Sequence, residues 1–284
     1  MNQIIGRNIL REVKAKCEPF KEEFSNKKIN IIRFAPPPDE TNNITLAKYE
    51  AARYSTEHKV KTFKFMNCQV DSQLWRDNTT AREFEDIISA ANLDLNTIGV
   101  IVQNPVPPDL KEVLELIRPE KDLDGLQENH PLFSASATSE TIARLVKSFA
   151  SKDSVVAVVG GKGFVGRGVI KLLNLEKINC LSLDVGDHLL KTLQADIIVS
   201  ATGVNELLDE RHIRPYHQLV VDAGFIPFQN KIFGDVKQSA YEIPKNLTPV
   251  PGGVGPLQMA TLLERLIKVA TNRSIEPWIY IDRS

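Results

Sequence analysis

The sequence is poor in cysteine, carries almost no net charge and contains no long apolar run. Its three cysteines, Cys17, Cys68 and Cys180, lie far apart without metal-ligand spacing, which predicts free thiols in a reducing cytoplasm. A net charge of −1 gives no indication of a nucleic-acid partner or of an anionic membrane surface. Apolar runs such as VVAVV are far too short to span a bilayer. We therefore expect a cytoplasmic protein with no nucleic-acid or membrane partner.

Metal-binding and targeting signals are also missing. The first twenty residues lack the apolar core and the cleavage site of a signal peptide, and they are typical of an amphipathic helix. The histidines form no metal-ligand motif, so we expect them to be solvated or to have hydrogen-bonded structural roles, and no metal site is predicted. The five histidines are His58, His130, His188, His212 and His217.

Strands and helices alternate along the chain, and this order favours parallel sheets with helices on their faces. Asn43 or Thr45 is a candidate N-cap for helix 44–59, and helix 79–93 begins close to a capping box. The predicted strands are 28–35, 60–68, the start of 97–110, 154–160, 178–184, 195–201 and 217–224. The predicted helices are 1–20, 44–59, 79–93, 110–117, 139–150, 165–176 and one after residue 258.

A glycine motif follows directly on the strand at 154–160. Gly161, Gly163 and Gly166 form G-x-G-x-x-G at the turn into the next helix. The first glycine permits a tight turn, the second lets a pyrophosphate approach the backbone, and the third lets helix and strand pack closely. Free N–H groups at the helix N-terminus then hold the phosphates. This context predicts a dinucleotide site; the alternative is a glycine-rich turn kept for packing alone.

The end of the following strand indicates which dinucleotide is bound. Asp184 stands about where an acidic residue binds the adenosine ribose of NAD. A carboxylate there would repel a 2′-phosphate, and no arginine lies beside it. The sequence therefore favours NAD over NADP as the cofactor. The alternative is that Asp184 merely ends the strand or caps the helix after it.

A series of motifs runs through nearly the whole chain in a constant order. They are VQNPVPPDL, RPEKDLDGLQENH, VVGGKGFVGRGV, VVDAGF, GDV and TPVPGGVGPLQMATLLE. Together they resemble the motifs of the methylenetetrahydrofolate dehydrogenase/cyclohydrolase (FolD-like) family, of which the chain is identified as a divergent member. The last motif, at 248–264, is the longest and most specific. In the family this loop lies near folate and nicotinamide, and Pro and Gly there would fix its path and let the backbone approach a flat ligand.

The resemblance implies both the fold and the reaction. We expect an α/β protein with two domains around a cleft, assembled as a homodimer. Residues 1–148 would form the N-terminal catalytic, folate-binding domain, and 149–256 the C-terminal NAD(P)-binding Rossmann domain. A C-terminal helix, 257–284, would pack back on the catalytic domain. The family's enzymes pass a hydride from methylene-tetrahydrofolate to a nicotinamide, and most then hydrolyse the methenyl product to formyl-tetrahydrofolate.

The resemblance also assigns residues to the sites. Asp124 aligns with the aspartate that holds the pterin ring, and Gln103 with the glutamine that orients a catalytic lysine. The catalytic candidates are Lys48, Tyr49, Arg53, Gln103 and Asp124. The substrate-binding candidates are Pro251, Gly252, Gly253 and Val254. The cofactor-binding candidates are Gly160, Gly161, Lys162, Gly163, Gly166, Asp184, Thr202, Gly203 and Phe225.

The catalytic lysine is the point of departure from the family. Its pattern S-x-x-Y-x-x-x-K places Tyr49 at the tyrosine but Arg53 at the lysine, and a one-residue shift places Lys48 at the tyrosine. An arginine stays protonated and is a poor general base for water attack. Lys48, about one turn earlier, is the lysine that could reach in instead. We therefore expect dehydrogenase activity with cyclohydrolase activity reduced or absent.

Three alternatives stay open at this point. The chain could be an ordinary bifunctional enzyme in which Lys48 or Arg53 serves in a shifted site. It could be a catalytically silent paralogue that binds folate or a nucleotide. It could also act on a different one-carbon or pterin-like substrate. The altered helix and the segment ATSET (137–141), which replaces the family's C-T-P-x-G, are the reasons to keep the silent paralogue open.

Overall fold

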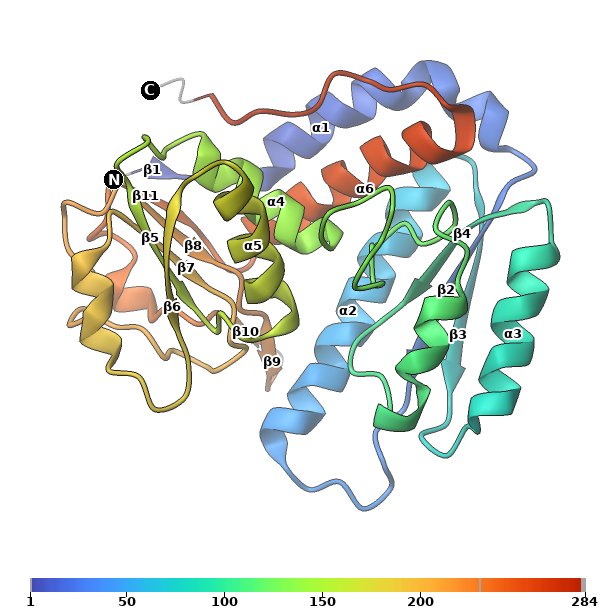
Figure 1. The fold of residues 1–284 in the computed structure, drawn as a ribbon, viewed down its shortest axis with the longest axis horizontal. Helices are drawn as coiled ribbons and strands as arrows, with labels where there is room; N and C mark the ends of the chain where they lie inside the picture. The colour runs from blue at the N-terminus through green and yellow to red at the C-terminus, as the bar shows by residue number, and fades with distance from the viewer. Residues whose placement is uncertain (1, 230, 282–284) are drawn as a thin grey trace. The chain divides into compact units, whose positions relative to one another are not determined.

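The computed structural model describes residues 2–229 and 231–281, and the chain divides into two compact units. Unit 1 contains the described residues of Met1–Arg11, Ser134–Gln258 and Trp278–Ser284. Unit 2 contains Glu12–Phe133 and Met259–Pro277. Each unit has its own parallel sheet with helices packed on it (Figure 1), so the predicted two-domain α/β fold is confirmed.

Unit 1 is built on a six-stranded parallel sheet with the strand order β1-β11-β8-β7-β5-β6. Its central strands are almost wholly apolar and buried, as expected for parallel strands covered on both faces. An antiparallel hairpin, β9-β10, follows β8. The strands are β1 Asn2–Gln3, β5 Val155–Val159, β6 Asn179–Leu183, β7 Ile197–Ser200, β8 Leu219–Asp222, β9 Ile226–Phe228, β10 Lys231–Phe233 and β11 Asn246–Thr248.

Helices α4 (Ala137–Lys147) and α5 (Phe164–Leu175) pack against each other within unit 1. Gly168 allows this contact, because a Cβ there would lie 2.4 Å from Ser139 Oγ. The Ser139 hydroxyl donates to the Val165 carbonyl at 2.9 Å. The chain thus returns to unit 1 at Ser134, before α4, whereas the sequence placed the boundary between 148 and 149. Two 3-10 helices, η4 (Leu189–Gln194) and η5 (Gln238–Ala240), complete the unit.

Unit 2 has a three-stranded parallel sheet in the order β3-β2-β4, with α2 and α3 on opposite faces (Figure 1). Thr80 and Glu83 form the predicted capping box at the start of α3. The N-cap of α2 is Asn42, one residue before the predicted Asn43 and three before Thr45, because its side chain accepts the N–H groups of residues 44 and 45. The elements are β2 Lys28–Phe34, α2 Asn43–Phe65, β3 Gln69–Trp75, α3 Ala81–Leu93 and β4 Thr97–Val102.

The predicted strand at 60–68 is wrong. Helix α2 continues to Phe65, and the strand β3 begins only at Gln69, after Asn67 has turned the chain with a φ of 61°. Thr62 and Phe63 are buried on the helix side that also buries Thr56. The β-like alternation in VKTFKFMNC is therefore the end of an amphipathic helix, whose packing overrides local propensity.

The predicted helix at 110–117 is also corrected. The segment forms two short 3-10 helices, η2 (Pro108–Leu110) and η3 (Glu112–Leu116). The Gln127 side chain donates to the carbonyls of Leu114, Glu115 and Ile117, which are acceptors that a longer α-helix would use.

The C-terminal helix is shorter than predicted. Helix α6 spans Val254–Thr271, and Asn272 ends it with a φ of 52°, the left-handed conformation common after helices. Residues 272–281 have no regular structure, and residues 282–284 of the predicted 257–284 segment lie outside the described residues. Within unit 2, Arg265 of α6 donates to the Leu123 carbonyl at 3.1 Å. At the N-terminus, α1 covers Gly6–Cys17 and a 3-10 helix, η1, covers Glu18–Phe24.

Most histidines have the structural role expected of them. The Nδ1 atoms of His130, His188, His212 and His217 accept backbone N–H groups of nearby turns. All three cysteines are free, and burial raises the pKa of Cys17 and Cys68 to about 12. Within 2–229 and 231–281, no group of three or more His, Cys, Asp and Glu side chains could hold a metal ion. No helix in these ranges is long and apolar enough to cross a membrane.

Candidate functional site

The glycine-rich turn of unit 1 has the shape that phosphate binding requires. A Cβ on Gly161 would lie 2.1 Å from Ser182 Oγ, and one on Gly166 would lie 2.2 Å from the Gly160 carbonyl oxygen. Gly160 itself has a φ of 84°, which favours glycine. Gly163 is the N-cap of α5 and has no side chain that could accept a hydrogen bond from the helix. The first N–H groups of α5 are therefore not capped by it. This geometry fits the pyrophosphate of a dinucleotide.

Asp184 lies beside the glycine turn, just after β6. Its carboxylate accepts the Lys162 N–H at 3.0 and 3.2 Å and the Ser182 hydroxyl at 3.2 Å. Its own N–H donates to Asp187. The carboxylate thus stands at the turn that carries the predicted phosphate site, as a residue that reads the ribose would.

Two further loops at the carboxyl edge of the sheet carry predicted cofactor residues. Thr202 and Gly203 follow β7, and Gly203 has a φ of 66°. Phe225 follows β8 and is half-buried. Ala201 carries its carbonyl oxygen to within 2.8 Å of the place that a Cβ on Gly160 would occupy, so the β7 loop packs directly on the glycine turn.

The proline–glycine loop at the start of α6 combines two different requirements for glycine. Gly252 has a φ of 116°, whereas a Cβ on Gly253 would lie 2.6 Å from the Thr248 Cβ. Pro251 follows a cis peptide bond, and Val254 is buried as the first residue of α6. Nothing lies within 4 Å of the place of a Gly252 Cβ, so this loop presents bare backbone there.

Unit 2 holds a buried ion pair that the sequence did not predict. The Lys59 ammonium of α2 lies 2.6 Å from the Asp124 carboxylate, and the two residues are only 1% and 7% exposed. Asp124 is the predicted pterin-binding aspartate. The missed signal was periodicity: Ala52, Thr56 and Lys59 share the buried side of α2, and a lysine in such a stripe requires a partner.

The loop that carries Asp124 is held by two neighbouring charges. Lys121 donates to the carbonyls of Ala91, Asn92 and Asp94 at 2.8 to 2.9 Å and so caps the end of α3. Asp122 accepts the N–H groups of residues 125 to 127. In the segment KDLDG the first two charges therefore build the loop, and the third faces Lys59.

Comparison with known proteins decides the family. Residues 4–124 match the catalytic domain, and residues 136–274 the NAD(P)-binding domain, of tetrahydrofolate dehydrogenase/cyclohydrolase.

The chain belongs to the tetrahydrofolate dehydrogenase/cyclohydrolase family.

Similar proteins cover most of its length. The bifunctional protein FolD of Ruthia magnifica is 29% identical over 94% of this chain and 98% of its own. That of Lactobacillus acidophilus is 36% identical over 66% and 71%. The crystal structure of the bifunctional enzyme FolD from Campylobacter jejuni is 25% identical, covers 94% of this chain and 96% of its own, and has a TM-score of 0.75.

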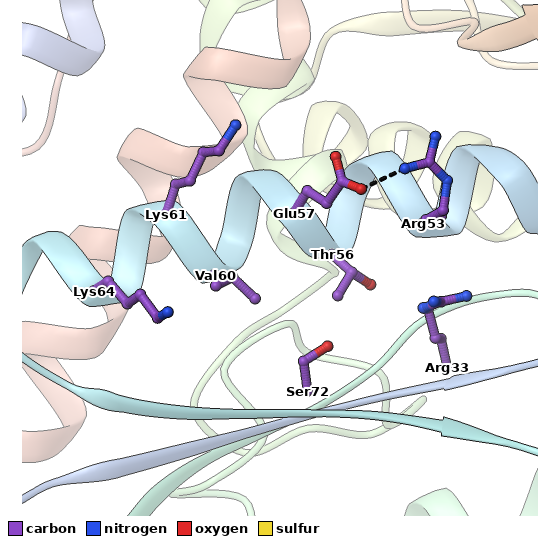
Figure 2. Close-up of a pocket in the computed structure, with 8 residues that line it drawn as sticks. All are labelled: Arg33, Arg53, Thr56, Glu57, Val60, Lys61, Lys64 and Ser72. Carbon is purple, nitrogen blue, oxygen red and sulfur yellow. Dashed lines mark hydrogen bonds and ion pairs between the residues drawn. The ribbon is translucent and has the colours of Figure 1, made fainter.

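Among the described residues, Asp124 forms its ion pair with Lys59 and not with Arg53 or Lys48, the predicted replacements for the family's lysine. Arg53 forms ion pairs with Glu50 and Glu57 along one side of α2. It lines a pocket of about 410 Å³ with Arg33, Lys61, Lys64 and other side chains (Figure 2). Lys48 is exposed, and Tyr49 packs against the apolar core of unit 2.

Lys59 offers a lysine to the family pattern in a different register, in which the serine and the tyrosine of the pattern do not match. With Lys59 as the lysine of S-x-x-Y-x-x-x-K, Ser55 takes the place of the tyrosine. Gln103 lies just after β4, is 6% exposed, and its amide nitrogen has no hydrogen-bond partner among the described residues. Such an unpaired buried donor is costly in free energy and calls for a partner such as a water molecule or a ligand.

Proposed function

We propose that the chain oxidises methylene-tetrahydrofolate with a nicotinamide dinucleotide and hydrolyses the methenyl product to formyl-tetrahydrofolate. The observation that carries this proposal is the buried Lys59–Asp124 pair. The expectation of weak cyclohydrolase activity rested on Arg53, which stands where the family's pattern has its lysine when Tyr49 is taken as the tyrosine. Lys59 supplies a lysine, and its partner is the aspartate that the family uses for the pterin.

Asp124 and Lys59 have different proposed roles, substrate binding and proton transfer, because of their different chemistry. Asp124 can accept two parallel hydrogen bonds from the donor edge of an aminopyrimidine. The methylene carbon loses a hydride to the bound nicotinamide and becomes a methenyl cation. Water then adds to this carbon and loses a proton, which a neutral lysine amine can accept and an arginine cannot. Since the Asp124 carboxylate favours the ammonium form, Lys59 serves as this base only after the pterin has taken Asp124 as its partner and the ammonium has released its proton to solvent. By the family resemblance Gln103 would orient the Lys59 side chain, and because an ammonium can only donate, this contact would use the amide oxygen of Gln103.

The cofactor we propose is NAD. Asp184 places a carboxylate beside the Lys162 N–H of the glycine turn, where a 2′-phosphate would be repelled. The variant Asp184→Asn should raise kcat/KM for NADP at least about tenfold, because like charges in contact cost several kcal/mol. Equal kcat/KM values for NAD and NADP in the unmodified protein would contradict the NAD preference. The proposed reaction would still stand.

The reaction itself is tested by two absorbance signals. Purified protein is mixed with methylene-tetrahydrofolate and NAD or NADP, and the methenyl product and the reduced nicotinamide are followed together. We expect reduced nicotinamide to form and the methenyl signal to decay faster than without protein. Lys59→Met should slow that decay by at least about 100-fold, the typical share of a general base. Lys48→Met is the matched control and should change neither signal. Full hydrolysis by Lys59→Met would overturn the role given to Lys59.

A second candidate is a dehydrogenase with weak hydrolysis. Ser55 favours it, because Ser55 lies one helical turn before Lys59, where the family pattern has its tyrosine. In that case reduced nicotinamide and methenyl product would rise in step, and Ser55→Tyr would restore hydrolysis. We also propose a cytoplasmic homodimer, as the family resemblance implies; light scattering on the purified protein tests the dimer.

A further inference from the structure

Two motifs of unit 1, VDAG and GDV, interlock through their aspartates and glycines. A Cβ on Gly234 would lie 1.9 Å from Asp222 Oδ2, and one on Gly224 would lie 2.2 Å from Asp235 Oδ1. The glycine of each motif therefore makes room for the aspartate of the other. Both aspartates are fully buried. The glycine and aspartate of VDAG and of GDV are therefore required by the packing of the two segments, whether or not they also contact a ligand.

Asp222 ties its own loop to the GDV segment. Its Oδ1 accepts the N–H groups of Gly224 and Asp235 at 3.0 and 2.9 Å, and its Oδ2 accepts the Val236 N–H at 3.0 Å. The loop that begins after β8 at Ala223 is thus held by a carboxylate. Three backbone donors on one carboxylate form a cage that favours the ionised group.

Asp235 extends the cage to the loop after β7. Its Oδ2 accepts the Ser200 hydroxyl at 2.8 Å and the Thr202 N–H at 2.7 Å, while its Oδ1 has no hydrogen-bond partner among the described residues. The Thr202 hydroxyl in turn accepts the Val204 N–H at 3.1 Å. Since the Ala201 carbonyl packs on Gly160, this loop connects the carboxylates to the glycine turn.

Holding Asp222 and Asp235 ionised side by side in the interior is electrostatically unfavourable. Burial and the charge of Asp235 raise the pKa of Asp222 to about 7, and burial raises the pKa of Asp235. Among the described residues, Tyr241 is the other titratable side chain that interacts with Asp222: burial, the Asp222 charge and the Glu206 charge all raise the pKa of Tyr241. From β11, the Thr248 hydroxyl accepts the Asp222 N–H at 2.9 Å and adds no charge. Two like charges are thus kept close by backbone N–H donors.

We infer that Asp222 and Asp235 are positioning residues for the dinucleotide, and that affinity for it falls when the pair takes up a proton. Protonation removes an acceptor from the cage and frees the β7 and β8 loops, which carry Thr202, Gly203 and Phe225. The inference rests on the proposed dinucleotide-binding function. It concerns how that site is held in shape, with neither carboxylate touching the cofactor.

Calorimetric titration of the full-length protein with NAD, and separately with NADP, between pH 8 and pH 6 tests the inference. The dissociation constant should rise about fivefold towards pH 6, since one hydrogen bond is worth a factor of about 2 to 10. Asp235→Asn should bind about fivefold more weakly at pH 8 and show little further change with pH. Ser200→Ala, a milder variant, should bind about twofold more weakly. Asp153→Asn, an exposed charge-matched control in unit 1, should follow the unmodified protein.

Unfolding experiments separate positioning from a merely structural role. The folded Asp222 has a pKa near 7 and binds its proton at higher pH than the unfolded chain, whose ordinary value is 3.8. The unmodified protein should therefore gain stability relative to Asp222→Asn as pH falls from 8 to 6 while it loses dinucleotide affinity. If the dinucleotide affinity does not change with pH, or rises together with stability towards pH 6, the inference is wrong and the proposed function still stands. No binding at any pH would overturn both the inference and the proposed function.

Discussion

The two units bury aspartates in different ways. In unit 2, Asp124 faces an opposite charge, the Lys59 ammonium, brought from a helix 65 residues away in the sequence. In unit 1, Asp222 and Asp235 face each other's segments and are held by backbone N–H groups and one hydroxyl. The first arrangement depends on a single side chain. The second depends on backbone geometry, and therefore on the glycines that permit it.

This difference decides where each unit is vulnerable. An ion pair breaks when one partner is removed, because the other charge stays buried without compensation. The backbone donors of the cage can be removed only by proline, so its main weak points are Gly224 and Gly234, where any side chain would displace a carboxylate.

The largest effect is expected at Lys59. Lys59→Met leaves the Asp124 carboxylate buried without its partner and should lower the free energy of unfolding by about 3 to 5 kcal/mol. Urea unfolding at neutral pH measures this loss. Lys61→Met, on the exposed side of the same helix, should stay within about 0.5 kcal/mol of the unmodified protein. The double variant Lys59→Met with Asp124→Leu should recover most of the loss; a double variant as unstable as the single one would contradict the ion-pair account.

A somewhat smaller effect is expected in the backbone cage of unit 1. Gly234→Ala places a Cβ against the Asp222 carboxylate and should destabilise the protein by about 1 to 3 kcal/mol, the usual cost of overpacking. Gly255→Ala is the matched control, because nothing lies within 4 Å of its Cβ position and it lies in α6. That control should be neutral or stabilising by up to about 1 kcal/mol. Equal thermal unfolding of both variants would show that the interlocked glycines are not needed.

Lys121 tests a charge held by backbone groups within unit 2. Its ammonium caps three carbonyls at the end of α3, and Lys121→Met leaves these partly buried acceptors unpaired. We expect a loss of about 1 to 3 kcal/mol, from unfolding curves in urea. The loss should be smaller than at Lys59, because no opposite charge is left behind. A larger loss than for Lys59→Met would reverse this order.

The smallest effect concerns pH. His217 is fully buried, burial lowers its pKa below the ordinary 6.5, and its Nδ1 accepts the Arg214 N–H. The unfolded chain takes up this proton first as pH falls, so stability from a neutral His217 is present above pH 6.5 and declines below it. Between pH 7 and pH 5, His217→Gln should lose less stability than the unmodified protein. An identical pH dependence of the two unfolding midpoints would refute this role.

Local patterns in the sequence were sufficient for much of the fold. The apolar strands at 154–160 and 195–201, the glycine turn between β5 and α5, and the capping box at Thr80 were all predicted, because each depends on residues close together in the chain. Where local and tertiary preferences disagreed, the prediction failed. The segment 60–68 alternates like a strand, but Thr62 and Phe63 are buried inside unit 2 as part of α2, which continues to Phe65.

The lysine was missed for a different reason. Lys59 lies within the predicted helix 44–59, but with Tyr49 as the family's tyrosine the pattern puts Arg53 at the lysine position. The sequence by itself determined two α/β units, a dinucleotide-type turn and the family. Only the tertiary structure decided that Lys59 meets Asp124 and that Asp222 meets Asp235. Strands, turns and caps are short-range and leave a local pattern, whereas a buried charge is paired by whichever segment the folded chain brings to it.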